Sequence, residues 1–466
     1  MLFERFEDKG LSQFSYAIGC EGCGEIAVVD PRRDTDIYLE FAHARGVRIV
    51  AVLETHIHAD FASGARALAQ QTGADLFLSA YDEGELYEVS FPHTATRDGD
   101  ALTLGKTRLV ALHTPGHTPE HLSFLAYDLA RSPQVPQLML SGDFLFVGSL
   151  GRPDLIGEAM KRQLASQLYD SVKEKLGPLP DGLEVHPGHG AGSMCGSGMS
   201  ARPMTTLGFE RLANRYLAAD LARDAFIEDI LAHVPPFPPY YKRMKVLNVK
   251  GADPIEDLPG QDAIPARDFH TLMESGHVVV DLRDQLSFGA GHIPGVFGIG
   301  AAGNLSTWAG WVVPPDAPIL LVAARPDQVP DAVRALLRVG LDDVRGYLDG
   351  GMEKWIGAGY PVTHIREVTP GEFINVRGEE PMFLVDVRTR DEFGTGHVPG
   401  ARNILAGHLA DRVAELPRDG TPIAVICGTG YRSTVAASVL ERAGFPQVVN
   451  ITGGMAAWLQ SGLPTE

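Results

Sequence analysis

Histidine and aspartate side chains recur directly after three apolar runs in the first half of the chain. In chain order, these residues are His56, His58, Asp60, His117 and Asp143. The runs before them, 47–53, 108–112 and 137–140, read as buried β-strands, so each cluster lies in a loop at the end of a strand. Strands that end on the same side of a sheet place their loops around one pocket, where imidazole and carboxylate groups can bind a metal ion. The spacing therefore predicts a metal site rather than histidines scattered in surface loops.

The motifs around these residues resemble the metallo-β-lactamase superfamily. They are THIHAD at 55–60, TPGHT at 114–118, SGD at 141–143 and HPGHG at 186–190. The two-metal hydrolases of that superfamily carry a histidine directly after the aspartate of the first motif, where this chain has Phe61. A phenyl ring has no lone pair to donate, so this departure favours a single-metal centre.

In this departure the chain resembles the persulfide dioxygenases, which have a single-metal centre. That resemblance implies one Fe(II) per chain, held by His56, His117 and Asp143. Two histidines and one carboxylate leave positions open for a substrate and O₂, as non-haem Fe(II) oxygenases require. The resemblance also implies an αββα sandwich for this part of the chain.

Residues near the expected ligands have expected roles of their own. His58, Asp60 and His189 are expected to orient the ligands through hydrogen bonds rather than to bind the ion. Arg152, in the motif GRPD, is either a surface arginine or, as the resemblance implies, an anchor for the carboxylate of a thiol substrate. Cys195 is either a small apolar residue in a glycine-rich loop or a sulfur acceptor near the site.

After a proline-rich stretch the chain repeats itself. The corresponding segments are VDLR at 280–283 with VDVR at 385–388, FGAGHIPG at 288–295 with FGTGHVPG at 393–400, and GGMEKW at 350–355 with GGMAAW at 453–458. Copies of about a hundred residues are tandem domains, because solenoid repeats are shorter. Strands alternating with helices in each copy predict a parallel sheet covered on both faces. The series of motifs resembles the rhodanese fold.

The two copies differ where chemistry would occur. In the second, the apolar run 423–426 leads into Cys427, a glycine-containing loop and Arg432. Loop N–H groups, the start of a helix and the guanidinium all favour a thiolate, so Cys427 and Arg432 are the expected catalytic residues. The expected substrate-binding residues are Gly428, Thr429, Gly430 and Tyr431. In the first copy, run 319–322 leads into Ala323 and no cysteine, which excludes cysteine-dependent transfer there.

The spacing between Cys427 and Arg432 favours sulfur over phosphate chemistry. Rhodanese-related phosphatases resemble this loop but have one residue more between the cysteine and the arginine. The longer loop suits a tetrahedral oxyanion, whereas the loop in this chain suits a sulfur atom.

These patterns predict an α/β chain of four segments. They are a metallo-β-lactamase-like αββα domain at 1–234, a linker at 235–261, a cysteine-free rhodanese-like domain at 262–364 and a cysteine-bearing one at 365–466. The prolines within 235–239 cannot continue a helix and favour an extended connector, part of which can pack on the first domain. Within the first domain, the patterns predict a hairpin over 14–30, a helix over 159–175 and one or two helices over 207–232.

Together, the motifs resemble fusions of a persulfide dioxygenase with rhodanese domains. The resemblance implies that O₂ oxidises a low-molecular-weight persulfide to sulfite at the iron, and that Cys427 carries sulfane sulfur between sulfite or thiosulfate and a thiol. One alternative is a metal-dependent thioester hydrolase of the glyoxalase II kind joined to a sulfurtransferase. Another is a sulfide-stress scaffold whose rhodanese copies only bind partners.

The composition restricts the possible partners. A formal charge of −19 would repel nucleic acid and anionic membranes, and no apolar run approaches the ~20 residues of a membrane span. Four cysteines are too few for a disulfide framework, and Cys20 with Cys23 lacks the second pair of a structural zinc site. We expect a cytoplasmic homo-oligomer whose partners are small molecules: a persulfide, a thiol, O₂, sulfite and thiosulfate.

Overall fold

The computed structural model of the protein describes residues 1–218 and 220–466. Its contacts divide the chain into two compact units. The first unit contains residues 1–256 with 337–340, and the second contains residues 257–336 with 341–466. Within the described residues, no helix is both long and apolar enough to cross a membrane.

The first unit is built on two six-stranded sheets. One sheet follows chain order: β1 (Leu2–Asp8), β2 (Gln13–Cys20), β3 (Glu25–Val29), β4 (Arg48–Leu53), β5 (Asp75–Ser79) and β6 (Thr94–Thr96). The other has the spatial order β14 (Thr205–Thr206), β13 (Glu184–Pro187), β10 (Leu138–Gly142), β9 (Leu122–Asp128), β8 (Thr107–His113) and β7 (Ala101–Leu104). β2 and β3 form the hairpin expected over 14–30, and a short hairpin of β11 (Leu145–Phe146) and β12 (Ser149–Leu150) follows β10.

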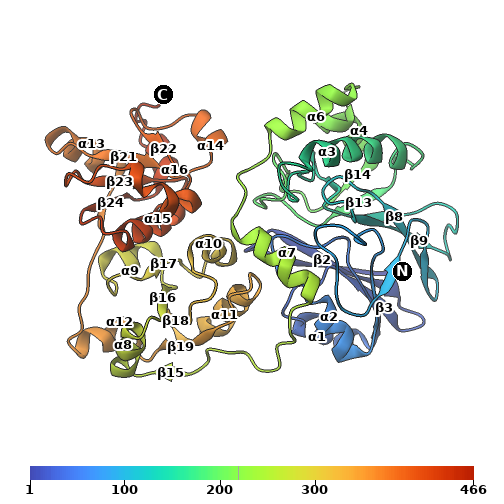
Figure 1. Ribbon diagram of the computed structural model, residues 1–466, viewed down its shortest axis with the longest axis horizontal. Helices are drawn as coiled ribbons and strands as arrows, with labels where there is room; N and C mark the ends of the chain where they lie inside the picture. The colour runs from blue at the N-terminus through green and yellow to red at the C-terminus, as the bar shows by residue number, and fades with distance from the viewer. Residues whose placement is uncertain (219) are drawn as a thin grey trace. The chain divides into compact units, whose positions relative to one another are not determined.

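Helices cover the outer face of each sheet, which gives four layers (Figure 1). α1 (Asp36–Arg45) and α2 (Ala65–Thr72) pack on the first sheet, and α3 (Lys161–Asp170) and α6 (Arg223–Ala232) pack on the second. All eight residues of β2 are buried, because one face contacts the helices and the other contacts the second sheet. The predicted αββα sandwich is confirmed.

The helices expected over 159–175 and 207–232 are present. The first is α3, which continues into a π-helical turn at Ser171–Lys175. The second is divided into α4 (Leu207–Ala213), α5 (Arg215–Ala218) and α6.

The segment after the prolines differs from the extended linker expected over 235–261. Residues 240–250 form α7 (Tyr240–Lys250), which belongs to the first unit. Pro239 stands at the N-cap, where a missing N–H removes no hydrogen bond of the helix. The buried residues of α7 recur at helical spacing and are Tyr240, Tyr241, Met244, Lys245 and Asn248. α7 is therefore packed against the sandwich.

The second unit contains two five-stranded parallel sheets with the same strand order. The first copy has the order β15 (Ala263–Ile264), β19 (Val344–Leu348), β18 (Ile319–Val322), β16 (Val278–Asp281) and β17 (Phe297–Gly298). The second has β20 (Arg366–Val368), β24 (Val448–Ile451), β23 (Ile423–Ile426), β21 (Phe383–Asp386) and β22 (Arg402–Asn403). Each copy is therefore an α/β domain with the predicted parallel sheet.

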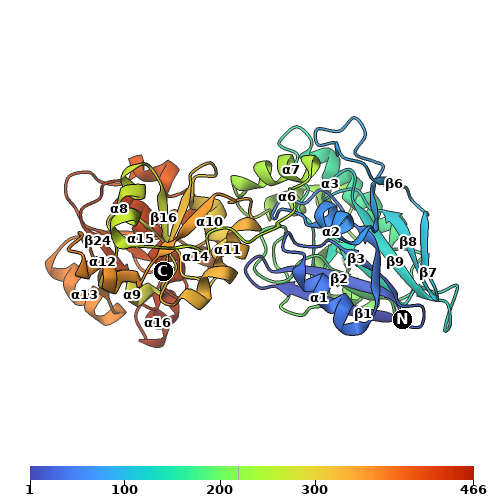
Figure 2. The same cartoon turned by 90° about the horizontal axis from the view of Figure 1, so that it is seen from below.

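Helices surround the strands of both copies (Figure 1 and Figure 2). In the first copy they are α8 (Ala266–Glu274), α9 (Gln285–Ala290), α10 (Leu305–Val312), α11 (Val329–Leu337) and α12 (Gly351–Gly357). In the second they are α13 (Pro370–Glu379), α14 (Arg390–Gly394), α15 (Tyr431–Arg442) and α16 (Gly454–Gln460).

Candidate metal centre and sulfur-transfer loop

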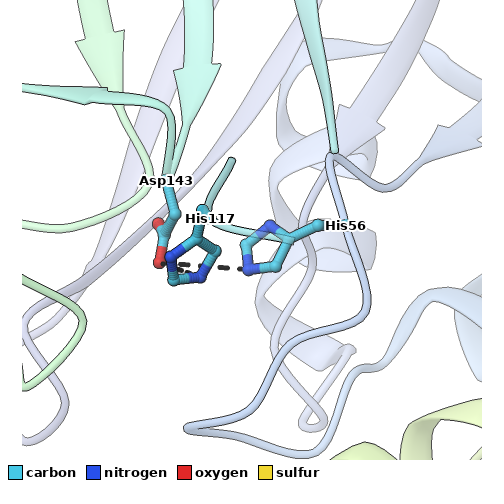
Figure 3. A group of neighbouring side chains, drawn as sticks. All are labelled: His56, His117 and Asp143. Atoms are coloured by element: carbon cyan, nitrogen blue, oxygen red, sulfur yellow. Dashed lines mark ion pairs between the residues drawn. The ribbon is translucent and has the colours of Figure 1, made fainter. Parts of the chain in front are cut away.

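Three loops at the ends of strands bring His56, His117 and Asp143 together. His56 follows β4, His117 lies between β8 and β9, and Asp143 follows β10. Figure 3 shows the three side chains pointing toward one another from these separate segments. Asp143 Oδ2 lies 3.4 Å from His117 Nε2 and 3.9 Å from His56 Nε2. One atom from each residue lies within 4.8 Å of the other two, a spacing that suits one shared ion.

The atoms that face this point lack other partners. His56, His117 and Asp143 are 2%, 0% and 0% exposed. Within the described part of the chain, no group hydrogen-bonds to His56 Nε2, His117 Nε2 or Asp143 Oδ2. Because buried polar atoms are costly to leave unpaired, three such atoms around one point indicate a cation site. Imidazole nitrogen and carboxylate oxygen suit Fe(II) with open positions, and they also suit Zn(II).

A hydrogen-bonded chain orients the ring of His56. The Thr55 hydroxyl donates to Asp30 Oδ2 at 2.8 Å and lies 2.9 Å from His56 Nδ1. Because the hydroxyl proton is directed to Asp30, the Thr55 oxygen accepts the Nδ1–H of His56, which leaves the lone pair on Nε2. Burial, and then the charges of nearby basic groups, holds the pKa of His56 and of His117 well below the ordinary value. Both rings are therefore neutral, which is the state that binds metals.

His189 lies between two carboxylates. Its Nδ1 is 2.7 Å from Asp143 Oδ1, and its Nε2 is 2.7 Å from Asp60 Oδ2. Burial disfavours a charge on His189, but the charges and hydrogen bonds of Asp143 and Asp60 outweigh it and hold the pKa well above its ordinary value. A ring that donates from both nitrogens has no lone pair for a metal. His189 thus contacts the candidate ligand Asp143 directly, and Asp60 contacts the other side of His189.

His58 is directed away from the three-residue group. Its Nε2 lies 3.2 Å from Asp30 Oδ1, and it clusters with Asp30 and Glu54. Burial opposes its charge, but Asp30 and the nearby carboxylates raise the pKa of His58 to about 9. The ring of Phe61, which is fully buried, lies 4.4 Å from that of His58.

The backbone at residue 188 approaches Asp143 closely. A Cβ on Gly188 would lie 2.7 Å from Asp143 Oδ1, the oxygen that faces His189. On the other side, the N–H of Asp143 donates to His121 Nε2 at 3.0 Å. The conformation of Asp143 is therefore fixed from both sides.

Helix α7 holds the loop of residues 57–61, which follows the candidate ligand His56, in place, a role that the sequence patterns did not indicate. Lys245, 1% exposed, donates from Nζ to Ile57 O at 2.8 Å. Asn248 donates from Nδ2 to the carbonyl oxygens of His58 and Phe61, each at 2.8 Å. Because Lys245 and Asn248 interrupt the apolar pattern on the buried face of α7, hydropathy does not indicate that this helix packs on the domain.

Arg152 differs from the expected substrate anchor. It is 2% exposed, and its Nε and Nη2 donate to Asp154 at 2.6 and 2.8 Å. The remaining donors contact the carbonyl oxygens of Met194, Pro235 and Pro236. A substrate carboxylate would have to displace these partners, so the contacts give Arg152 the role of joining the loops around the site.

Cys195 is buried near the second carboxylate. Its side chain clusters with Asp60 and His189, and its Sγ lies 3.9 Å from the hydroxyl of Tyr241. Burial and the negative charges of Asp60 and Asp143 hold the pKa of Cys195 well above its ordinary value. A neutral thiol is a poor nucleophile, so this environment weighs against the expected role as a sulfur acceptor. Like the other three cysteines, Cys195 is free.

In the second unit, the loop between β23 and α15 surrounds Cys427. The cysteine is 1% exposed, and the backbone N–H of Gly430 donates to its Sγ at 3.1 Å. Its Sγ also lies 3.5 Å from the hydroxyl of Ser433. Gly428 is half-buried and Thr429 is exposed, so the loop remains accessible from one side.

The guanidinium of Arg432 is paired with a carboxylate. Its Nη1 and Nη2 donate to Glu392 at 2.7 and 2.6 Å. Burial opposes ionisation of Glu392, but the hydrogen bonds and charge of Arg432 outweigh it and lower the pKa to about 2. The positive charge expected to act on Cys427 is thus shared with Glu392, which the sequence patterns did not indicate.

Comparison with known proteins agrees with this division of the chain. The family model described as "Metallo-beta-lactamase superfamily" matches residues 8–189, and the model described as "Rhodanese-like domain" matches residues 265–358 and 369–461. A solved structure of a metallo-beta-lactamase from Staphylococcus aureus subsp. aureus COL is 36% identical, with a TM-score of 0.68. That likeness covers 74% of this chain and 98% of the other.

Curated relatives match the first unit. A hydroxyacylglutathione hydrolase from Polaromonas sp. is 33% identical over 41% of this chain, which spans 66% of that relative. The hydroxyacylglutathione hydrolase GloC from Haemophilus influenzae is 27% identical over 41% of this chain and 86% of its own length. The chain therefore belongs to the metallo-β-lactamase superfamily through its first unit and carries two rhodanese-like domains in its second.

Proposed function

We propose that the protein oxidises a low-molecular-weight persulfide with O₂ and transfers sulfane sulfur through Cys427. In the oxidation, a persulfide, O₂ and one water give a thiol, sulfite and two protons. In the transfer, a second persulfide and sulfite give a thiol and thiosulfate. The thiol is released in both reactions, and the net effect is detoxification of sulfide and persulfide.

The observation that carries this proposal is the group of three ligand atoms, on His56, His117 and Asp143, that have no hydrogen-bond partner. His56, His117 and Asp143 surround one point, Phe61 offers no ligand, and both nitrogens of His189 are in use. Such a set suits one Fe(II), which when bound would supply the activation of O₂. Three protein ligands leave positions for the persulfide sulfur and O₂.

The residues around the ligands have defined tasks. Thr55 orients His56 so that its Nε2 would be available to the ion, and His189 holds Oδ1 of Asp143 so that Oδ2 would be available to it as well. The ring of Phe61 is fully buried and has no lone pair to donate at the position where the two-metal hydrolases have a histidine.

Sulfur transfer is assigned to Cys427. Its thiolate attacks the outer sulfur of a persulfide, a sulfur–sulfur bond forms on Sγ, and the thiol leaves with its electron pair and a proton. Sulfite then attacks the outer sulfur, thiosulfate leaves, and the thiolate is regenerated. The N–H of Gly430, which lies at hydrogen-bond distance from Sγ, stabilises the negative charge at the start and the end of the cycle.

Thioester hydrolysis is a second candidate function, because the relatives of the first unit include proteins named hydroxyacylglutathione hydrolase. The ligand atoms also suit Zn(II), so the choice depends on the reaction rather than on the ligand set.

A paired assay on the full-length protein tests the proposal. Glutathione persulfide and coenzyme A persulfide are supplied with O₂, and a hydroxyacyl thioester of glutathione is supplied separately. We expect persulfide-dependent O₂ uptake with formation of sulfite and thiosulfate, and little thioester cleavage. Rapid thioester cleavage without O₂ uptake would establish the hydrolase instead.

A further inference from the structure

The cysteine-free repeat, residues 262–364, contacts the loop that carries Cys427, although it has no nucleophile of its own. We propose that this repeat is a positioning element for the neighbouring site, and that Gln285 and the Tyr431–Gly300 contact hold the loop in its active conformation. The inference rests on the sulfur transfer proposed for Cys427. It gives the cysteine-free repeat a role in the chemistry of the other copy.

Tyr431, at the start of α15, is fixed by the cysteine-free repeat. Its hydroxyl donates to the backbone oxygen of Gly300 at 2.8 Å. Its ring lies against Gly303, where a Cβ would collide with the ring carbons. Burial raises the pKa of Tyr431, so the hydroxyl remains protonated and able to donate.

Gln285, at the start of α9, packs against the other side of the loop tip. A Cβ on Gly430 would collide with Oε1 of Gln285, and Gly430 has φ +107°, a conformation that favours glycine. Gly430 is the residue whose N–H donates to Cys427 Sγ at 3.1 Å. Gln285 therefore restricts the backbone group that contacts the sulfur.

Helix α15 is attached to the cysteine-free repeat further along its length. His292, fully buried, has Nε2 2.7 Å from Glu441 Oε2. Arg442 donates to the backbone oxygen of Gly295 and stacks over the ring of Phe297 at 4.0 Å. These contacts fix the helix axis, while Tyr431 and Gln285 fix the loop at its end.

Movement of the loop would affect the reaction itself, because the loop supplies the N–H of Gly430 that donates to Cys427 Sγ. If Tyr431 loses its partner, residues 428–431 can move and the N–H of Gly430 no longer points steadily at the sulfur. Both half-reactions use Sγ, so both should slow. Loss of a binding contact would instead affect one substrate.

Two single substitutions in the full-length protein test this inference. Tyr431→Phe removes the hydroxyl, and Gln285→Ala removes the contact with Gly430. The matched controls are Tyr347→Phe, on the half-buried tyrosine of β19, and Gln447→Ala, on an exposed glutamine. We expect Tyr431→Phe to lower kcat/KM about fivefold for the sulfur donor and equally for the acceptor, the size of effect expected for one hydrogen bond. Gln285→Ala should also lower kcat/KM for the donor and the acceptor equally. The controls should match the wild type.

A second measurement does not depend on sulfur transfer. The rate at which iodoacetamide alkylates Cys427 reports the accessibility and reactivity of the thiol. Mass spectrometry of the peptide that contains Cys427 measures this rate. We expect Tyr431→Phe and Gln285→Ala to change this rate, and Tyr347→Phe to leave it unchanged. Test variants that match the wild type in alkylation and in both half-reactions would overturn the inference. A wild type that transfers no sulfur, but whose alkylation responds to Tyr431→Phe, would refute the proposed function and leave the positioning role standing.

Discussion

Asp143 and His189 share a hydrogen bond of 2.7 Å that occupies one carboxylate oxygen, Oδ1, and leaves Oδ2 free. Oδ2 is the oxygen that faces His56 and His117. Asp60 lies on the opposite side of the same imidazole, so two carboxylates share one positive charge. In the one-metal site that we propose, this relationship gives His189, a histidine of the last superfamily motif, a role that does not require it to bind the metal.

The first prediction concerns His189. His189→Ala should weaken binding of Fe(II) about tenfold, because loss of a partner that orients a ligand has effects of this size. Competition with a chelator under anaerobic conditions measures the affinity. The matched control is His186→Ala in the same HPGHG motif, since His186 contacts Glu184 rather than Asp143. Equal affinities for the two variants would show that the His189 contact does not support the metal site.

The second prediction concerns α7. Asn248→Ala should leave three buried backbone groups unpaired, the carbonyls of His58 and Phe61 and the N–H of Ser63. The free energy of local opening of residues 54–64, which protects their amides from hydrogen exchange, should fall by about 3 kcal/mol, given about 1 kcal/mol for each lost hydrogen bond. Hydrogen exchange read by mass spectrometry measures it. Val246→Ala, on the exposed face of the same helix, should exchange like the wild type; similar exchange in both variants would contradict the assigned role.

The third prediction concerns acid stability of the second unit. Glu392 has a folded-state pKa of about 2 because of Arg432, and an unfolded glutamate titrates near pH ~4.3. Since the folded value is the lower one, the pair stabilises the fold above pH ~4.3, and this contribution is lost as the pH falls toward about 2. The pair is partly exposed, so we expect about 1 kcal/mol.

Urea unfolding monitored by tryptophan fluorescence can follow this change, because all four tryptophans (Trp308, Trp311, Trp355 and Trp458) are in the second unit. Glu392→Gln should be less stable than the wild type at pH 6, and the difference should shrink below pH ~4. Glu380→Gln, which removes a surface pair with Arg366, is the control. A difference that is independent of pH would argue against an ionised Glu392.

The fourth prediction separates the two activities. Cys427→Ser should abolish sulfur transfer, because a serine hydroxyl cannot hold sulfane sulfur and the cysteine-free repeat offers no replacement. O₂ uptake should remain largely intact, and the products should shift from thiosulfate to sulfite. Cys23→Ser is the control, since Cys23 is exposed on the hairpin turn of the first unit. Thiosulfate production by the Cys427→Ser variant would show that sulfur is transferred elsewhere.

Much of the fold could be predicted because the signals were local and repeated. Each expected metal ligand follows an apolar run that forms a strand, and the two copies of the second unit align motif by motif. The absence of a cysteine after β18 was visible from that alignment alone. The α/β architecture followed from the same patterns.

The parts that the sequence did not indicate depend on contacts between distant residues. Lys245 and Asn248 are polar residues in a segment that follows several prolines. Neither hydropathy nor composition therefore indicates that Lys245 binds the carbonyl of Ile57 and that Asn248 binds those of His58 and Phe61. The pairing of Arg432 with Glu392 joins helices α14 and α15, which are distant in the sequence, and it has no sequence signature. The pairing of Arg152 with Asp154 could more easily have been predicted, since the two residues are only two positions apart in the sequence.

Reconstitution of the metal-free, full-length protein with Fe(II) or with Zn(II) tests the central claim most directly. Metal content per chain and persulfide-dependent O₂ uptake are measured on the same samples, with His117→Ala as the control. The account predicts one iron per chain, O₂ uptake with Fe(II) only, and loss of both metal and activity in His117→Ala. Two zinc ions per chain, with hydrolysis of a hydroxyacyl thioester and no O₂ uptake in the Fe(II) form, would contradict it.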